Sequence, residues 1–260
     1  MRGFFTGNGF QHVVDRGDMQ PRFEGSWGAS DEDLFDKSLE RLALLHAQGR
    51  PFFSLIFSSS NHEPFEFPDG RIQLHDRSKQ TVANAVKYAD YALGQFIAKA
   101  KKEAYWNDTV FLIVADHDNR VYGDSLVPIK KFHIPGLILG AGIEPRRIKP
   151  IASQIDLAPT LLSLIGVSSE HPMIGRDFAK DSETPGRALM QFGDYFAWLE
   201  GTTATVLRPG KAPMLGSYDA ASGALQFSAS QPSPLQVETA MAHVMLPSLL
   251  YREQRYRLAP

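Results

Sequence analysis

The sequence contains no cysteine. Thiol nucleophiles, thiolate metal sites and disulfides are therefore excluded, and histidine, aspartate and glutamate remain as the side chains that could hold a metal ion. The sequence also lacks an excess of charge of either sign, because its 27 basic residues nearly balance its 29 acidic ones, for a formal net charge of −2. A chain so close to neutral carries no general electrostatic footprint for nucleic acid, and we expect no nucleic-acid partner.

Several longer patterns are absent as well. No apolar run approaches the length of a membrane-spanning helix, and the first residues lack the charged-then-apolar pattern of a signal peptide. No phosphate-binding glycine loop, dinucleotide fingerprint or Gly-x-Ser-x-Gly turn occurs, which excludes several common enzyme classes. What remains is a composition of 43% hydrophobic and 22% charged residues over 260 positions, which indicates a globular chain with a substantial core.

Apolar runs alternate with amphipathic segments over the first two thirds of the chain. Helical spacing predicts three helices, at residues 31–47, 79–102 and 154–166. Fully apolar runs predict three buried strands, at residues 51–57, 109–116 and 133–140. In the second helix we expect one apolar side, made by Val82, Val86, Ala89, Leu93, Phe96 and Ile97. Such alternation is typical of an α/β fold with a mostly parallel sheet sandwiched by helices.

The pattern changes after about residue 185. Short alternating stretches broken by glycine predict a small antiparallel sheet, and the tail predicts a closing helix interrupted near Pro247. We therefore divide the chain into an α/β part at residues 1–184 and a small antiparallel α+β part at residues 185–260.

Two of the predicted strands run into polar side chains where they end. The run at 109–116 leads to Asp116, His117 and Asp118, and the run at 51–57 leads to His62. Ligands of open α/β sheets bind at the carboxyl ends of the strands, and a carboxylate beside an imidazole suits Zn²⁺ or Mn²⁺ better than Ca²⁺. The alternatives are ordinary: Asp116 as a helix cap, His117 hydrogen-bonded within its loop, and Asp118 as a cap or supporting partner.

Asp156 is the one further carboxylate with two interpretations. It lies at the start of the third predicted helix, where aspartate is favoured as a cap, and it could equally face a site. The spacing does not separate the two.

Taken in order, several segments resemble the sulfatase-like part of the lipoteichoic acid synthase and phosphoglycerol transferase family, within the alkaline-phosphatase-like superfamily. The matching segments are MRGFFTGNGFQHVVD, SWGASDEDLFDKSLE, SSSNHEPF, YADYALGQFIAKAKKEAYWNDTVFLIVADHD, HIPGLILG and SQIDLAPTLLSLIGV. They cover most of residues 1–180, and it is their combination and order that carries the resemblance.

The resemblance implies roles for four residues. Asp116 and His117 match a metal-ligand pair, with Mn²⁺ as the first choice ahead of Zn²⁺, Mg²⁺ and Ca²⁺. His62 matches a histidine that contacts the substrate's phosphate, and Arg2 matches a phosphate-binding arginine. The family's threonine nucleophile and glutamate ligand have no counterpart here, so we assign no catalytic residue. We expect a fragment of a longer enzyme, completed by an upstream half or a partner chain and prone to self-association.

The function implied is transfer of a glycerophosphoryl group from a phospholipid headgroup, or hydrolysis of another phosphate or sulfate ester, in cell-envelope polymer synthesis. The alternatives are a sulfatase or phosphodiesterase fragment, and a non-catalytic binding domain. The resemblance also implies that the parent enzyme is anchored in a membrane with its catalytic domain outside the cytoplasm, although this chain shows neither signal nor anchor.

Overall fold

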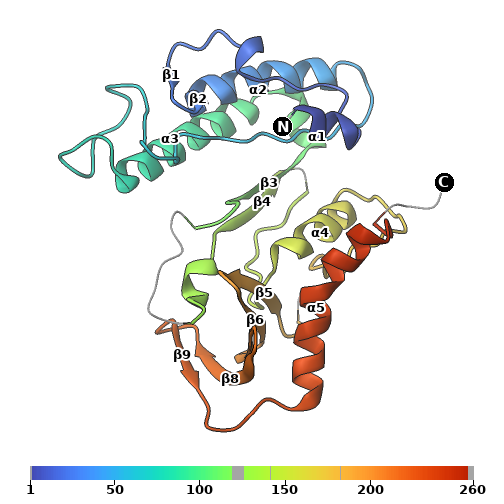
Figure 1. Ribbon diagram of the computed structural model, residues 1–260. Coiled ribbons are helices and arrows are strands. Elements are labelled where there is room, and N and C mark those ends of the chain that lie inside the picture. The colour runs from blue at the N-terminus through green and yellow to red at the C-terminus, as the bar shows by residue number, and fades with distance from the viewer. Residues whose placement is uncertain (1, 119–125, 141, 182, 257–260) are drawn as a thin grey trace. The chain divides into compact units, whose positions relative to one another are not determined.

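The computed structural model describes residues 2–118, 126–140, 142–181 and 183–256 (Figure 1). The chain divides into two compact units, Met1–Thr109 and Val110–Pro260. This boundary differs from the predicted division at residues 184 and 185, which stays a prediction. Among the described residues, no helix is long and apolar enough to cross a bilayer.

The first unit is built on two helices that lie side by side (Figure 1). They are α2 (Asp31–His46) and α3 (Val82–Ala100). Its other elements are α1 (Arg2–Gly7), η1 (Arg16–Asp18), β1 (Glu24–Gly25), β2 (Gly28–Ala29) and η2 (Ala104–Asp108). Ser30 begins α2 by accepting a hydrogen bond from the Asp33 backbone N–H, and Thr81 begins α3 in the same way with Asn84. Both predicted helices are thus confirmed.

The buried face of α3 matches the predicted one only in part, since Phe96 is buried as predicted. Ala85, Tyr88, Ala92 and Phe96 point into the unit, where Tyr88 stacks on Phe67 at 5.0 Å between ring centroids. Val82 and Val86 are instead exposed. The helix is apolar on more than one side, so spacing alone did not show which side the neighbouring elements would cover.

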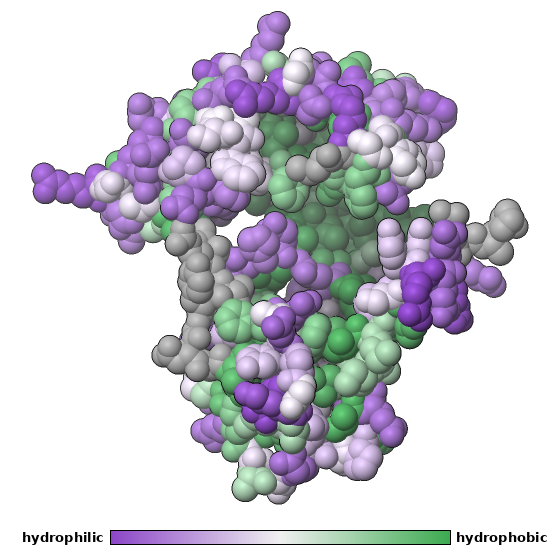
Figure 2. Space-filling view, viewed as in Figure 1, coloured by the Kyte–Doolittle hydropathy of each residue, from purple (hydrophilic) through white to green (hydrophobic). Residues whose placement is uncertain are grey.

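The predicted strand at residues 51–57 is wrong in this structure. The segment pairs with no other strand among the described residues, and Phe53, Leu55 and Phe57 are exposed at 66%, 51% and 62%. An apolar segment readily adopts an extended backbone. It becomes a strand of a sheet only when a partner strand supplies the ladder hydrogen bonds. Apolar side chains also reach the surface elsewhere on the face shown in Figure 2.

The second unit begins with a two-stranded sheet. Its strands β3 (Val110–Val114) and β4 (Gly136–Gly140) are antiparallel, with Val110 opposite Gly140 and Val114 opposite Gly136. Both strands are confirmed, but the prediction of parallel neighbours is wrong for this pair. A parallel neighbour needs a crossover, usually a helix, and the described chain between these strands holds only the short η3 (Ile129–Phe132).

The C-terminal part confirms the predicted antiparallel sheet. Five strands pair in chain order: β5 (Arg187–Phe192), β6 (Tyr195–Glu200), β7 (Thr203–Arg208), β8 (Lys211–Asp219) and β9 (Ala224–Phe227). Alternation along β6 sends Ala197 and Leu199 to one buried cluster and Trp198 to another, beneath Ala240 of α5. Helix α5 (Pro234–Arg252) runs through Pro247 without a break, so the predicted interruption is wrong.

One segment joins these two sheets along the chain. It contains η4 (Gln154–Asp156) and α4 (Leu157–Leu164), which together confirm the helix predicted over residues 154–166. Gly166 follows the helix with a φ of +73°, a conformation that glycine adopts without a steric penalty at a helix end.

Candidate functional site

His62 lies on a turn that is held from the start of α2. Oδ1 of Asp31 accepts hydrogen bonds from the backbone N–H groups of Ser59 (3.2 Å) and Ser60 (3.0 Å). The N–H of His62 then donates to the carbonyl of Ser59 at 3.0 Å. Asp31 is buried, and this burial raises the pKa of its carboxyl group. The histidine is thus carried on a turn that the protein interior fixes.

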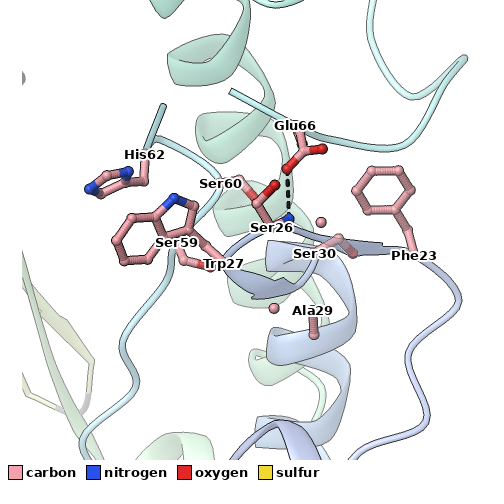
Figure 3. A pocket seen from close by; sticks show the side chains of 11 residues that line it. Phe23, Ser26, Trp27, Ala29, Ser30, Ser59, Ser60, His62 and Glu66 are labelled. Carbon is pink, nitrogen blue, oxygen red and sulfur yellow. Dashed lines mark hydrogen bonds between the residues drawn. The ribbon is translucent and has the colours of Figure 1, made fainter. Parts of the chain in front are cut away.

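Trp27 lies against His62 in the same unit, with the two ring planes tilted by 36° (Figure 3). The ring centroids are 3.6 Å apart, and the indole Nε1 donates to the carbonyl of Glu63 at 2.8 Å. Nδ1 of His62 lies 3.0 Å from the same carbonyl. Because a carbonyl only accepts hydrogen bonds, Nδ1 carries the proton and Nε2 is the ring nitrogen left for a ligand.

A small pocket opens beside this aromatic pair (Figure 3). Serine hydroxyls and backbone line much of it, and its lining includes Ser26, Trp27, Ser59, Ser60, His62 and Glu66. The space at its centre is about 10 Å³, roughly one water molecule. Glu66 accepts the Ser26 N–H at 2.6 Å, and this bond lowers the pKa of its carboxyl group. The pocket could hold a small polar group at its mouth, with the aromatic pair as one wall.

Arg2 is not among the residues that line this pocket. Its guanidinium donates to Asp15 at 3.0 and 2.7 Å and to Asp18 at 2.7 Å, and these hydrogen bonds raise its pKa. An anionic ligand would have to compete with two carboxylates for this side chain. The structure does not bring Arg2 and His62 together in one pocket.

Asp116 and His117 lie in the turn after β3, in the second unit. The His117 N–H donates to Oδ1 of Asp116 at 2.9 Å, and His117 Nε2 lies 3.4 Å from Oδ2 of Asp116. Nδ1 of His117 lies 2.7 Å from the carbonyl of Asp118, so Nδ1 carries the proton here as well. Both side chains are exposed.

This arrangement fits two ligands of one metal ion. Ligand atoms that each lie about 2.1 Å from an ion are about 3.4 Å apart at a tetrahedral angle. A histidine that binds a metal through one ring nitrogen usually donates its other N–H to a carbonyl or carboxylate, as His117 does to Asp118. No group of three or more His, Asp or Glu side chains gathers for an ion within the described ranges, so no third candidate ligand lies beside the pair there.

Asp156 faces the interior and no open site. It is fully buried, and its carboxylate accepts the backbone N–H groups of Ser153 (2.8 Å) and Arg176 (2.7 Å) and Nη1 of Arg187 (3.1 Å). Of the two interpretations left open by the sequence, the structure supports a cap, because Ser153 and Asp156 form a capping box around η4.

Two residues of these sites were missed by the sequence reasoning. Trp27 sits in the turn of the β1–β2 hairpin, and a tryptophan between Gly25 and Gly28 was a usable signal in the sequence. Gln154 donates to the carbonyls of Ala115 and Asp116, and nothing in the sequence around it indicates that role.

Comparison with known proteins places the chain in a family. The sulfatase family model matches residues 1–167. A curated relative, the lipoteichoic acid synthase-like protein YvgJ of Bacillus subtilis (strain 168), is 29% identical over 207 residues, which cover 68% of this chain and 32% of the relative. Phosphoglycerol transferase I of Xanthomonas euvesicatoria pv. vesicatoria (strain 85-10) is 26% identical over 199 residues, 72% of this chain and 27% of the relative. The chain thus spans about a third or less of these relatives.

Solved structures agree on the fold. A protein of the alkaline phosphatase superfamily from Vibrio parahaemolyticus is 45% identical with a TM-score of 0.94, covering 100% of this chain and 64% of that one. The lipoteichoic acid synthase LtaP of Listeria monocytogenes is 24% identical with a TM-score of 0.69, covering 86% and 60% respectively. The fold is that of the alkaline phosphatase superfamily, and the chain belongs to the sulfatase family.

Proposed function

We propose that this chain is the metal- and substrate-binding part of a phosphoglycerol transferase that acts in cell-envelope polymer synthesis. Asp116 and His117 hold a divalent ion, with Mn²⁺ as the first choice, and His62 contacts the phosphate of a phospholipid headgroup. Arg2 joins that contact only by exchanging its hydrogen bonds to Asp15 and Asp18 for the phosphate. The observation that carries the proposal is the 3.4 Å separation of His117 Nε2 and Asp116 Oδ2, with Nδ1 tied to a carbonyl. The family supports it, since its superfamily generally uses divalent metals.

The proposed chemistry divides between the ion and the protein. A bound divalent ion would polarise a phosphoryl oxygen and offset the charge that develops on it. Asp116 and His117 would hold that ion at the end of β3. His62 would bind a phosphate oxygen through Nε2, and since Nδ1 already donates to Glu63, this requires the imidazolium form. Trp27 would keep the ring in place.

The rest of the proposal concerns the longer protein. The nucleophile and the remaining ligands would come from polypeptide beyond this chain, supplied by the same enzyme or by a partner. The enzyme would be anchored in a membrane with this part outside the cytoplasm. A sulfatase or phosphodiesterase is the alternative within the same superfamily, and a non-catalytic binding domain is the alternative outside it.

Metal binding tests the ligand pair. We expect the purified chain to bind Mn²⁺ weakly, and Asp116→Ala or His117→Ala to raise the dissociation constant at least tenfold, because each removes one of two ligands. Titration of Mn²⁺ followed by electron paramagnetic resonance measures this. Asp194→Ala and His171→Ala are matched controls, since both residues are exposed in the same unit. Equal affinity in all four variants and the parent chain would rule the pair out as ligands.

Ester binding tests the histidine. We expect sn-glycerol 1-phosphate to shift the His62 ring signals in NMR titrations, and His62→Gln to weaken binding about tenfold or more, because a charge-assisted hydrogen bond contributes about 1.5–3 kcal/mol. His12→Gln, at an exposed histidine of the same unit, is the control. A sulfate monoester that binds more tightly than the phosphate ester would favour the sulfatase alternative. If His62→Gln binds both esters as tightly as the parent chain does, the proposed role of His62 is contradicted.

A further inference from the structure

The side chain of Gln154 clamps the backbone that carries the proposed ligand pair. Its Nε2 donates to the carbonyl of Ala115 at 3.1 Å and to the carbonyl of Asp116 at 2.8 Å. Both N–H bonds of one amide are thus used on two successive carbonyls. Gln154 lies 38 residues from Asp116 along the chain, so this contact is purely tertiary.

The clamped carbonyls lie where the sheet no longer holds the chain. The ladder between β3 and β4 ends with Val114 opposite Gly136, one residue before Ala115. Beyond that point the strand backbone loses its ladder hydrogen bonds, and the direction of the next peptide planes needs another restraint. The peptide groups at Ala115 and Asp116 set where the Asp116 carboxylate and the His117 ring point.

Gln154 can impose such a restraint because its own backbone is anchored from the interior. It begins η4, whose capping box joins Ser153 to Asp156. Asp156 is fully buried and paired with Arg187, at the start of β5, at 3.1 Å. The polar contacts therefore run from the five-stranded sheet through Asp156 and η4 to Gln154, and from there to the turn after β3.

We propose that Gln154 is a positioning residue that holds Asp116 and His117 in the geometry for one metal ion, and that the C-terminal sheet supports it through Arg187 and Asp156. The ion itself rests on the proposed function. The clamp gives the five-stranded sheet a role in the site although none of its strands supplies a proposed ligand.

The test measures both the Mn²⁺ affinity and the thermal stability of Gln154 variants. Gln154→Ala removes the side-chain amide, and Gln154→Met keeps the length of the side chain without its donors. We expect both to raise the Mn²⁺ dissociation constant about tenfold or more, in line with the loss of partners that orient metal ligands. The thermal midpoint should stay close to that of the parent chain, because the hydrogen bonds lie at the exposed surface.

Gln191→Ala is the matched control. Gln191 is an exposed glutamine of the same unit whose amide donates to a carbonyl of its own hairpin, Gly193, at 3.3 Å. Its replacement should leave Mn²⁺ affinity unchanged. Unchanged affinity in Gln154→Ala and Gln154→Met as well would overturn the proposal while leaving the metal site in place.

A second readout keeps the two proposals apart. If the parent chain binds no Mn²⁺, the metal site fails, and the clamp is then decided by hydrogen exchange at the His117 amide. This amide donates to Asp116 Oδ1, and we expect it to exchange at least several-fold faster in Gln154→Ala because the turn loses its restraint. Equal exchange rates of this amide in the parent chain and in Gln154→Ala would contradict the positioning role of Gln154.

Discussion

Asp156→Ala is expected to lower the free energy of unfolding of the second unit by about 3–5 kcal/mol. Asp156 is fully buried and Arg187 nearly so, and the two side chains are 3.1 Å apart. Removal of the carboxylate leaves the Arg187 charge without its carboxylate partner in the interior. It also removes the hydrogen-bond acceptor of the backbone N–H groups of Ser153 and Arg176. An uncompensated buried charge costs more than the pair contributes, so the loss far exceeds that of a surface contact.

Chemical denaturation followed through Trp198 measures this loss, because Trp198 is buried in the same unit. Asp194→Ala, at an exposed turn, is the control and should change stability by about 0.5 kcal/mol or less. The double variant Asp156→Ala with Arg187→Met should recover part of the loss, since no charge is then left alone. A loss below about 1 kcal/mol in Asp156→Ala would mean that water or another group already compensates Arg187.

Gly186→Ala is expected to destabilise the same unit by about 1–3 kcal/mol or more. A Cβ atom at this position would meet the backbone oxygen, nitrogen and carbon of Ile151, all closer than 3.0 Å. Backbone atoms cannot rotate away as a side chain can, so the segment from Ile151 to Gln154 has to shift. Because that segment carries the clamp on Ala115 and Asp116, we also expect weaker Mn²⁺ binding.

Gly136→Ala provides the comparison. Gly136 begins β4 in the same unit, and a Cβ atom there would meet nothing within 4 Å. Thermal unfolding and Mn²⁺ titration of the two variants separate a steric effect at Gly186 from a general effect of replacing glycine. Similar stability of both variants would show that the backbone at Ile151 shifts to accommodate the new Cβ atom without lowering the free energy of unfolding.

Local features of this protein followed from its sequence. The start of α2 at Ser30, the stop at Gly166 and the antiparallel strands after residue 185 each depend on neighbours within a few positions. Capping, left-handed backbone and alternation are local physics, so spacing and residue type were enough to predict them. The order of the matching segments also predicted the family, which the family model confirms.

Strand pairing did not follow in the same way. The run at residues 51–57 is largely apolar, as β3 is, yet it pairs with nothing among the described residues, while β3 pairs with an antiparallel neighbour. Hydrophobicity predicts that a segment prefers burial, whereas the choice and direction of a partner depend on residues far away in the chain.

By itself the sequence determined that Asp116 and His117 are covalent neighbours after an apolar strand, and that His62 follows another apolar run. Only the tertiary structure decided that His117 Nε2 and Asp116 Oδ2 lie at a spacing suited to one ion, that Trp27 lies against His62, and that Gln154 donates to the carbonyl of Asp116. The physical reason is separation along the chain: Trp27 and His62 are 35 residues apart, and Gln154 and Asp116 are 38 apart. Contacts of that kind form only when the chain folds back on itself, and no local pattern records them.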